Sequence, residues 1–165
     1  MGPGKHDIKQ AIFAGFVATA ILAILMYAAP LAGLPRIDLA SALGRPISGN
    51  PATVLSGAWW LGLAIFFLFG SVVSPYVFVY AYHGLLGSSW IRGVEWGVVV
   101  WVFGGVAVMT MMGLGFDEAH FAHPFTSFLL SLVGHVMYGA ILGGVAGGVL
   151  AHLREEHGPG IAARA

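Results

Sequence analysis

The chain has 165 residues, of which 58% are hydrophobic and only 8% are charged, and it contains no cysteine. Because soluble domains are about a quarter charged, this composition excludes a water-soluble protein, and the apolar excess excludes a disordered one. Seven basic and seven acidic residues give a net charge of zero, so there is no basic surface for nucleic acid. The absence of cysteine excludes disulfides, thiolate metal sites and cysteine nucleophiles. The composition therefore indicates an integral membrane protein.

Four continuous apolar segments follow one another along the chain. Each is long enough to cross a bilayer, which takes about 20 helical residues. Strands of a membrane barrel would alternate apolar and polar residues, and these segments do not, so we expect helices. The predicted spans are residues 11–34, 57–86, 90–114 and 125–153. The prediction is an all-α fold, a four-helix transmembrane bundle that forms a single integral membrane domain over residues 1–165.

Proline, glycine and aspartate predict where these helices bend, begin and end. The second span holds Ser74-Pro75 and is longer than the hydrocarbon core is thick, so we expect a kinked or tilted helix. In the polar connection before it, Asp38 is placed to cap a short amphipathic helix through Leu43, which Gly44 would end.

The distribution of lysine and arginine predicts the orientation of the bundle. Five of them lie at the two termini and the turn between spans two and three, and two lie in the first long connection. The five are Lys5, Lys9, Arg92, Arg154 and Arg164, and the two are Arg36 and Arg45. Because positive loops stay in the cytoplasm, both termini should be cytoplasmic, in the bacterial inner membrane.

Small residues predict where the helices touch. Gly139, Gly143 and Gly147 recur every four residues in the last span. Glycine lets helix backbones approach closely in lipid, so this face should pack tightly against a neighbouring helix. The neighbour could belong to this chain or to another subunit.

A polar stripe on the last span is the first candidate functional site. Ser127, Ser131, His135 and Tyr138 lie on one face of the predicted helix. His135 lies about 15 Å inside the span, and an ionisable residue so deep in a bilayer is a functional-site hypothesis. Three interpretations stay open for His135, with Tyr138 beside it: a neutral hydrogen-bonded histidine, a ligand of haem b or a metal, or a proton relay. If His135 is a neutral hydrogen-bonded histidine, no cofactor is expected.

Two further polar groups lie nearer the membrane surfaces. His83 and Glu95 flank the tight turn between spans two and three, where they should form a polar clasp, with Arg92 as a competing partner of Glu95. In the outer loop, Glu118, His120 and His123 have the chemistry of metal ligands, although a solvated loop cluster explains them as well.

Three segments of the chain resemble a known protein family. They read GLPRIDLASALG at residues 33–44, MMGLGF at 111–116 and LVGHVMYG at 132–139. They are similar to a family of small four-helix bacterial membrane proteins that is catalogued as a domain of unknown function. The likeness runs from about residue 12 to 150, and its most distinctive part is His-x-x-Tyr-Gly in the last span. Family members often have a polar residue early in span two, where this chain has Trp59-Trp60. The resemblance implies a fold and carries no activity.

The functional expectation is a non-catalytic accessory subunit of a larger membrane complex, in particular a respiratory or other electron-transfer complex. Its partners would be the lipid bilayer and other membrane subunits. One alternative is a haem- or metal-binding membrane protein that uses His135, and another is a small transporter or proton-conducting bundle. The sequence holds no nucleophile–base set, phosphate loop or dinucleotide motif, so we expect no enzyme activity of the chain by itself.

Overall fold

A computed structural model describes residues 3–34, 38–49, 53–108 and 124–155. Within these ranges the regular structure is helical, and no strand occurs. The α-helices are α1 (Lys5–Ala28), α2 (Leu39–Ser48), α3 (Gly57–Leu68), α4 (Ser74–Ala81), α5 (Ser89–Val100) and α7 (Pro124–Glu155). Short 3-10 helices follow α1 and α4, namely η1 (Ala29–Ala32) and η3 (Tyr82–Gly84). Two π-helical segments, η2 (Phe69–Val73) and η4 (Trp101–Val108), follow α3 and α5. The prediction of an all-helical chain is confirmed for the described residues.

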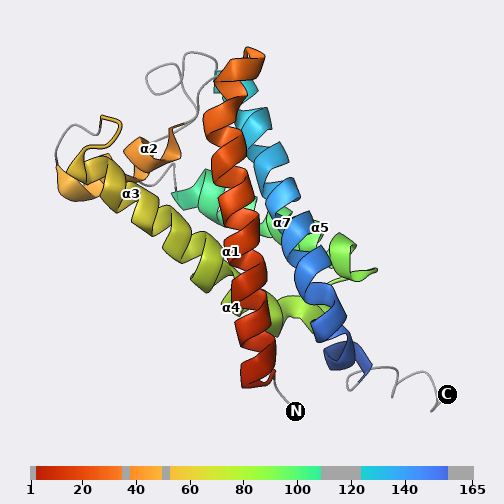
Figure 1. Cartoon of the computed structure of the whole chain (residues 1–165). Helices are drawn as coiled ribbons and strands as arrows, with labels where there is room; N and C mark the ends of the chain where they lie inside the picture. Colours follow the sequence, from red (N-terminus) through yellow and green to blue (C-terminus); the bar gives the residue numbers. More distant parts are fainter. Residues whose placement is uncertain (1–2, 35–37, 50–52, 109–123, 156–165) are drawn as a thin grey trace.

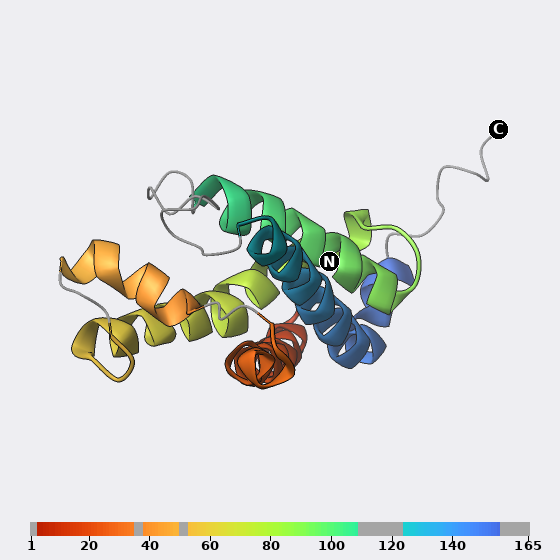
Figure 2. The ribbon, with the colours of Figure 1, turned by 90° about the horizontal axis from the view of Figure 1, so that it is seen from above.

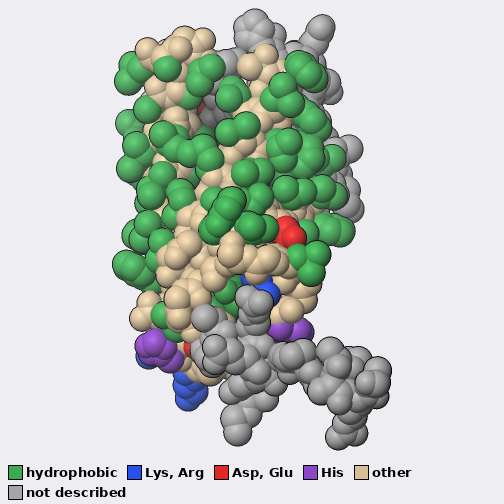
Figure 3. Space-filling model, turned by 90° about the vertical axis from the view of Figure 1, so that its right-hand side faces the viewer, with side chains coloured by type: hydrophobic (Ala, Val, Ile, Leu, Met, Phe, Trp, Pro, Cys, Tyr) green, Lys and Arg blue, Asp and Glu red, His purple; other side chains and the backbone are tan. Residues whose placement is uncertain are grey.

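Three helices in the described part are long and apolar enough to cross a membrane. They are Lys5–Ala32, Gly57–Gly84 and Phe125–Leu150. These agree with the first, second and fourth predicted spans. At the third predicted span, α5 and η4 form a helical stretch that the structure describes as far as Val108, and residues 109–114 lie outside the described residues. Side chains on one face are mostly hydrophobic along the helices, while lysine, arginine and histidine gather near the end where α1 begins (Figure 3).

The helices form two groups that separate toward one end of the molecule. α7 contacts both α1 and α5, and α2 packs along α3. The middle of the second span, η2 and α4, contacts α1, whereas α3 runs obliquely away from α1 and α7 (Figures 1 and 2). The first turn of α1 and the last turns of α7 lie at the same end (Figure 1). The separation of α2 and α3 from α5 and α7 leaves the space described below.

Glycines bring α5 and α7 into backbone contact. A Cβ atom built on Gly93 of α5 would overlap the carbonyl oxygen of Gly139, and one built on Gly139 would overlap the carbonyl oxygen of Gly93. Gly143 approaches Gly93 in the same way, and Gly147 lies against Ser89. The neighbour of the glycine face is therefore a helix of the same chain. Close contact of this kind is what holds helices together where lipid removes the hydrophobic drive.

The short helix α2 begins as predicted but ends later. The Asp38 side chain accepts a hydrogen bond from the Ser41 amide at 3.1 Å, which caps the first turn. The helix continues through Gly44 to Ser48 and is capped by Gly49, whose φ of 66° is left-handed. The expectation that Gly44 ends this helix is wrong, because Gly44 is a contact position. A Cβ atom there would overlap the carbonyl oxygen of Ala58 on α3.

The second span changes its helical geometry where the sequence places Pro75. The amide of Ser74 donates to the carbonyl of Phe69, five residues earlier, which is π-helical spacing. α1 packs closely at this point, since a Cβ atom on Gly15 would overlap the Pro75 ring and one on Gly70 would overlap the Thr19 hydroxyl. The predicted bend at Ser74-Pro75 takes the form of this π-helical segment.

Candidate functional site

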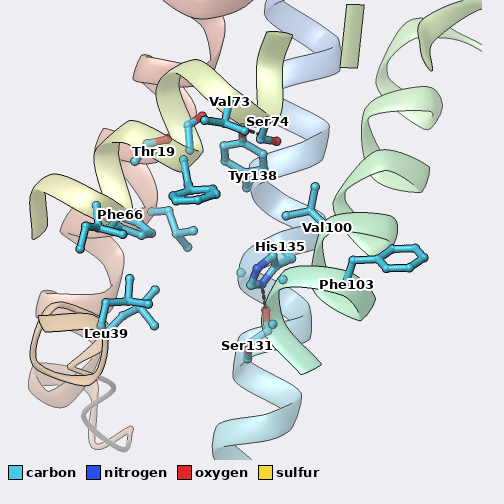
Figure 4. Close-up of a pocket in the computed structure, with 18 of the residues that line it drawn as sticks. Thr19, Leu39, Phe66, Val73, Ser74, Val100, Phe103, Ser131, His135 and Tyr138 are labelled. Atoms are coloured by element: carbon cyan, nitrogen blue, oxygen red, sulfur yellow. Dashed lines mark hydrogen bonds between the residues drawn. The ribbon is translucent and has the colours of Figure 1, made fainter. Parts of the chain in front are cut away.

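A cavity of 680 Å³ lies between the two helix groups. Cavities that bind small molecules in proteins have about 300–1,000 Å³. The α2 and α3 helices line one side, while α5, η4 and α7 line the other, and η2, α4 and α1 complete the wall. Most lining side chains are apolar, and the polar ones are Thr19, Ser74, Trp96, Ser131, His135 and Tyr138. Figure 4 shows the cavity with His135 on the α7 side and Leu39 and Phe66 across from it.

The imidazole of His135 lies in this cavity with one nitrogen paired and one unpaired. Its Nδ1 atom is 2.8 Å from the backbone carbonyl oxygen of Ser131, one turn earlier on α7 (Figure 4). A carbonyl only accepts hydrogen bonds, so Nδ1 carries the proton and donates it. The Nε2 atom then holds a lone pair, and it has no hydrogen-bond partner among the described residues. His135 therefore presents a hydrogen-bond acceptor or metal ligand to the cavity.

The facing helix leaves room beside this nitrogen. Gly105 of η4 lies next to the ring, and a Cβ atom built there would be 3.7 Å from Nε2 and 3.5 Å from Cε1. These distances are ordinary van der Waals contacts, so even a Cβ atom at position 105 would touch the imidazole. Glycine at this position leaves that edge of the ring without a side-chain contact from position 105.

Tyr138 lines the same cavity, but its hydroxyl joins α7 to the second span. Because residue 75 is proline, it has no amide to donate to Gly70, its partner at π-helical spacing. The Tyr138 hydroxyl donates to that carbonyl oxygen instead, at 2.6 Å. It also lies 3.1 Å from Oγ of Ser74, which accepts a hydrogen bond from Nε1 of Trp96 at 3.0 Å. In hydrocarbon an unpaired carbonyl costs several kcal/mol, so this contact supports the interior of the bundle.

Two buried hydroxyls near Gly70 have no hydrogen-bond partner. Thr19 of α1 is 0% exposed, Ser71 of η2 is 6% exposed, and the oxygens of both side chains are unpaired in the described structure. The sequence analysis does not single out either hydroxyl as a polar group inside the bundle. Thr19 follows Ala11 and Gly15 at helical spacing, which marks it as a packing residue, and its contact with Gly70 agrees with that.

The predicted polar clasp lies at the end of the second span, away from the cavity. Glu95 of α5 accepts a hydrogen bond from the Leu86 amide at 2.8 Å, and His83 lies exposed in η3. Arg92 donates to the backbone carbonyls of Tyr82 at 2.9 Å and Gly87 at 3.1 Å. Its guanidinium also lies 4.7 Å from the centre of the Tyr82 ring. These contacts fasten the turn between α4 and α5. None of these residues lines the cavity.

The candidate metal ligands Glu118, His120 and His123 lie outside the described residues. In the four described ranges, no group of three or more histidine, cysteine, aspartate or glutamate side chains could hold a metal ion. Among the described residues that line the cavity, His135 is the one histidine, and no cysteine, aspartate or glutamate lies beside it.

Comparison with known proteins identifies the chain at the level of a family. No curated protein and no solved structure matches it. A family model described as "Family of unknown function (DUF6789)" matches residues 5–157. This agrees with the resemblance found in the sequence, and it covers nearly the whole chain. The chain therefore belongs to this family of unknown function.

Proposed function

We propose that the chain is a four-helix protein of the bacterial inner membrane that holds a lipid-soluble molecule in its cavity, with His135 as the polar anchor. The fourth helix of this proposal is the predicted span 90–114, of which the structure describes α5 and η4. Both termini are placed in the cytoplasm on the count of lysine and arginine. The observation that carries the proposal is the unpaired Nε2 atom of His135 in a 680 Å³ cavity.

The position of His135 favours a ligand because polar groups are costly at this depth. His135 is the eleventh residue of the span Phe125–Leu150, so it lies near the bilayer centre. An unsatisfied acceptor there has no water to bind. A molecule that donates a hydrogen bond to Nε2, or coordinates it, removes that cost while its apolar body contacts the lining.

The lining favours binding over catalysis. Among the described side chains around the cavity, His135 is the one imidazole, and no carboxylate, lysine or arginine lines it. In nucleophilic catalysis a hydroxyl is hydrogen-bonded to its base, whereas the described hydrogen bond of His135 goes to the backbone carbonyl of Ser131. A histidine held in this way in a mostly apolar cavity is typical of a site that holds a molecule in place.

Haem b is one lipid-soluble candidate, because an iron porphyrin can be held by a single histidine. The hydrogen bond from Nδ1 to a backbone carbonyl is also the usual arrangement of a metal-ligating histidine. A second ligand from His83 is disfavoured, because His83 does not line the cavity.

The test is to extract and identify what travels with the purified protein. The full chain is purified from native membranes in mild detergent, and its organic extract is analysed by mass spectrometry together with its absorption spectrum. Val100→Trp places a large ring on a lining position (Figure 4), and Thr126→Val changes an exposed residue of α7 as a control. We expect a stoichiometric compound in wild type and Thr126→Val that Val100→Trp loses. Identical extracts from all three proteins, containing bulk lipid alone, would overturn the proposal.

Two further functions stay proposals with less support. An accessory subunit of a respiratory or other electron-transfer complex rests on short connections and few charges. The glycine face no longer supports it, because Gly139 and Gly143 contact Gly93 of the same chain. A proton-conducting bundle rests on His135, but the groups around Glu95 lie away from the cavity. Stable co-purification of a partner protein, or liposome flux that depends on His135, would favour one or the other.

A further inference from the structure

The hydrogen-bond state of His135 restricts what kind of molecule its cavity can hold. Nδ1 is committed as a donor to the Ser131 carbonyl oxygen at 2.8 Å, so Nε2 can only accept. If a ligand offered only an acceptor, such as a ketone, quinone or ether oxygen, two lone pairs would face each other at Nε2. Moving the proton to Nε2 would relieve this contact but would place the bare Nδ1 atom against a carbonyl oxygen. With an acceptor-only ligand, one of two contacts is therefore repulsive: either Nε2 against the ligand oxygen, or Nδ1 against the Ser131 carbonyl oxygen.

The hydroxyl of Ser131 is a second polar group at the same place. Ser131 lines the cavity one turn before His135 on the same face of α7. Its hydroxyl has no hydrogen-bond partner in the part of the chain that the structure describes. A hydroxyl can both donate and accept, so it complements Nε2, which only accepts. A group that donates to Nε2 and accepts from Ser131 satisfies both.

The rest of the lining defines the remainder of the molecule. Beyond His135 the cavity extends to Leu39, Leu43 and Ile47, the apolar face of α2. The wall between them is formed by aliphatic and aromatic side chains such as Phe66 and Val100 (Figure 4). A molecule that fits this cavity must therefore have a small polar group beside His135 and an apolar remainder.

We infer that the ligand of this cavity is a lipid alcohol or phenol, whose hydroxyl donates a hydrogen bond to Nε2 of His135. This inference rests on the proposed function and names its ligand class. It distinguishes the hydroxyl form of a lipid from its ether or ketone form, although both have the same apolar body. A reduced hydroquinone belongs to the first class, and its oxidised quinone belongs to the second.

The experiment compares two probes that differ in one methyl group. The full-length protein in detergent micelles is titrated with 4-dodecylphenol or with its methyl ether, and bound probe is counted by native mass spectrometry. Wild type should bind the phenol at least about 10-fold more tightly, because the ether leaves Nε2 without a donor. His135→Phe keeps a ring of similar size and should bind both probes equally. His135→Gln keeps an acceptor and should retain part of the preference, while His83→Phe, at an exposed histidine outside the cavity, should behave as wild type.

The outcomes separate this inference from the proposed function. Equal binding of phenol and ether by wild type overturns the ligand class and leaves the cavity as a binding site. If neither probe binds saturably, and the amount bound by wild type equals the amount bound by Val100→Trp, the proposed function is overturned as well. A Soret band that appears on adding iron protoporphyrin and is lost in His135→Phe assigns Nε2 to iron and also overturns the inference. If His135→Phe fails to fold, the phenol-to-ether ratio in wild type still decides.

Discussion

The hydroxyl of Tyr138 lies 2.6 Å from the carbonyl oxygen of Gly70, a residue 68 positions earlier in the chain. Pro75 lacks the amide that π-helical spacing would pair with that carbonyl, so a side chain from another helix replaces a backbone donor. The contact lies in the middle of the second span and of the last one. It ties the bend of one helix to the face of another that also presents His135.

Removing the Tyr138 hydroxyl should destabilise the protein. In Tyr138→Phe the Gly70 carbonyl stays buried without this donor, which should lower the free energy of unfolding by about 1–3 kcal/mol. Thermal unfolding in detergent measures the effect. Tyr80→Phe, at a half-exposed tyrosine on the same second span, should change stability little.

A double-mutant cycle tests the role of proline in the same contact. Pro75→Ala restores a backbone amide in the second span, so Tyr138→Phe should cost less in that background than in wild type. Additive effects of the two substitutions would contradict the explanation, because they would show that Tyr138 does not compensate for proline.

The glycine contact between α5 and α7 should tolerate no side chain. Gly139→Ala would place a methyl group on the backbone of Gly93, and we expect a loss of about 1–3 kcal/mol as the helices move apart. Gly144 and Gly148 on the same helix are matched controls, since a Cβ atom at either meets nothing within 4 Å. Alanine there should be neutral or stabilising, because alanine favours helix over glycine. Equal effects at positions 139 and 144, measured by thermal unfolding, would contradict the packing.

The buried hydroxyl of Thr19 should be dispensable. Thr19→Val keeps the shape of the side chain and removes an unpaired polar atom, so stability should stay equal or rise by about 1 kcal/mol. Thr126→Val, at an exposed site, controls for the change of residue type. A loss of more than about 1 kcal/mol at position 19 alone would show that the hydroxyl has a partner.

The predicted orientation can be tested with single cysteines, because the chain has none of its own. Val54 and Leu86 are exposed residues at opposite ends of the second span. A membrane-impermeant thiol reagent added to intact cells should label Val54→Cys from the periplasm and leave Leu86→Cys unlabelled. Both should react once the membrane is permeabilised. The reverse pattern in intact cells would contradict the cytoplasmic placement of both termini.

Composition and hydropathy are enough to predict the helical class and the three described helices that are long and apolar enough to span a membrane. These follow from local chemistry, because a long uncharged segment must satisfy its own backbone hydrogen bonds in lipid. The glycine spacing in the last span also indicated a contact face. The spacing could not identify α5 as the neighbouring helix, because it is a property of the last span alone and carries no information about the partner.

The parts that sequence reasoning missed all depend on how separate helices are placed. Gly44 was expected to end α2, because glycine is common at helix ends, and its contact with Ala58 is not visible in the local sequence. The hydrogen bond from the Tyr138 hydroxyl to the Gly70 carbonyl joins two helices, so the sequence of either helix alone does not indicate it. The cavity itself arises because α3 leans away from α7, and no pattern within either helix encodes that angle.

The most direct test of this account is the protonation state of the His135 ring, observed by nitrogen NMR on histidine-labelled protein in lipid nanodiscs. The His135 signals are assigned by their absence in His135→Gln. We predict a protonated Nδ1, an unprotonated Nε2, and a shift of the Nε2 signal on adding 4-dodecylphenol that its methyl ether does not produce. A protonated Nε2, or an Nε2 signal that neither probe changes, would contradict it.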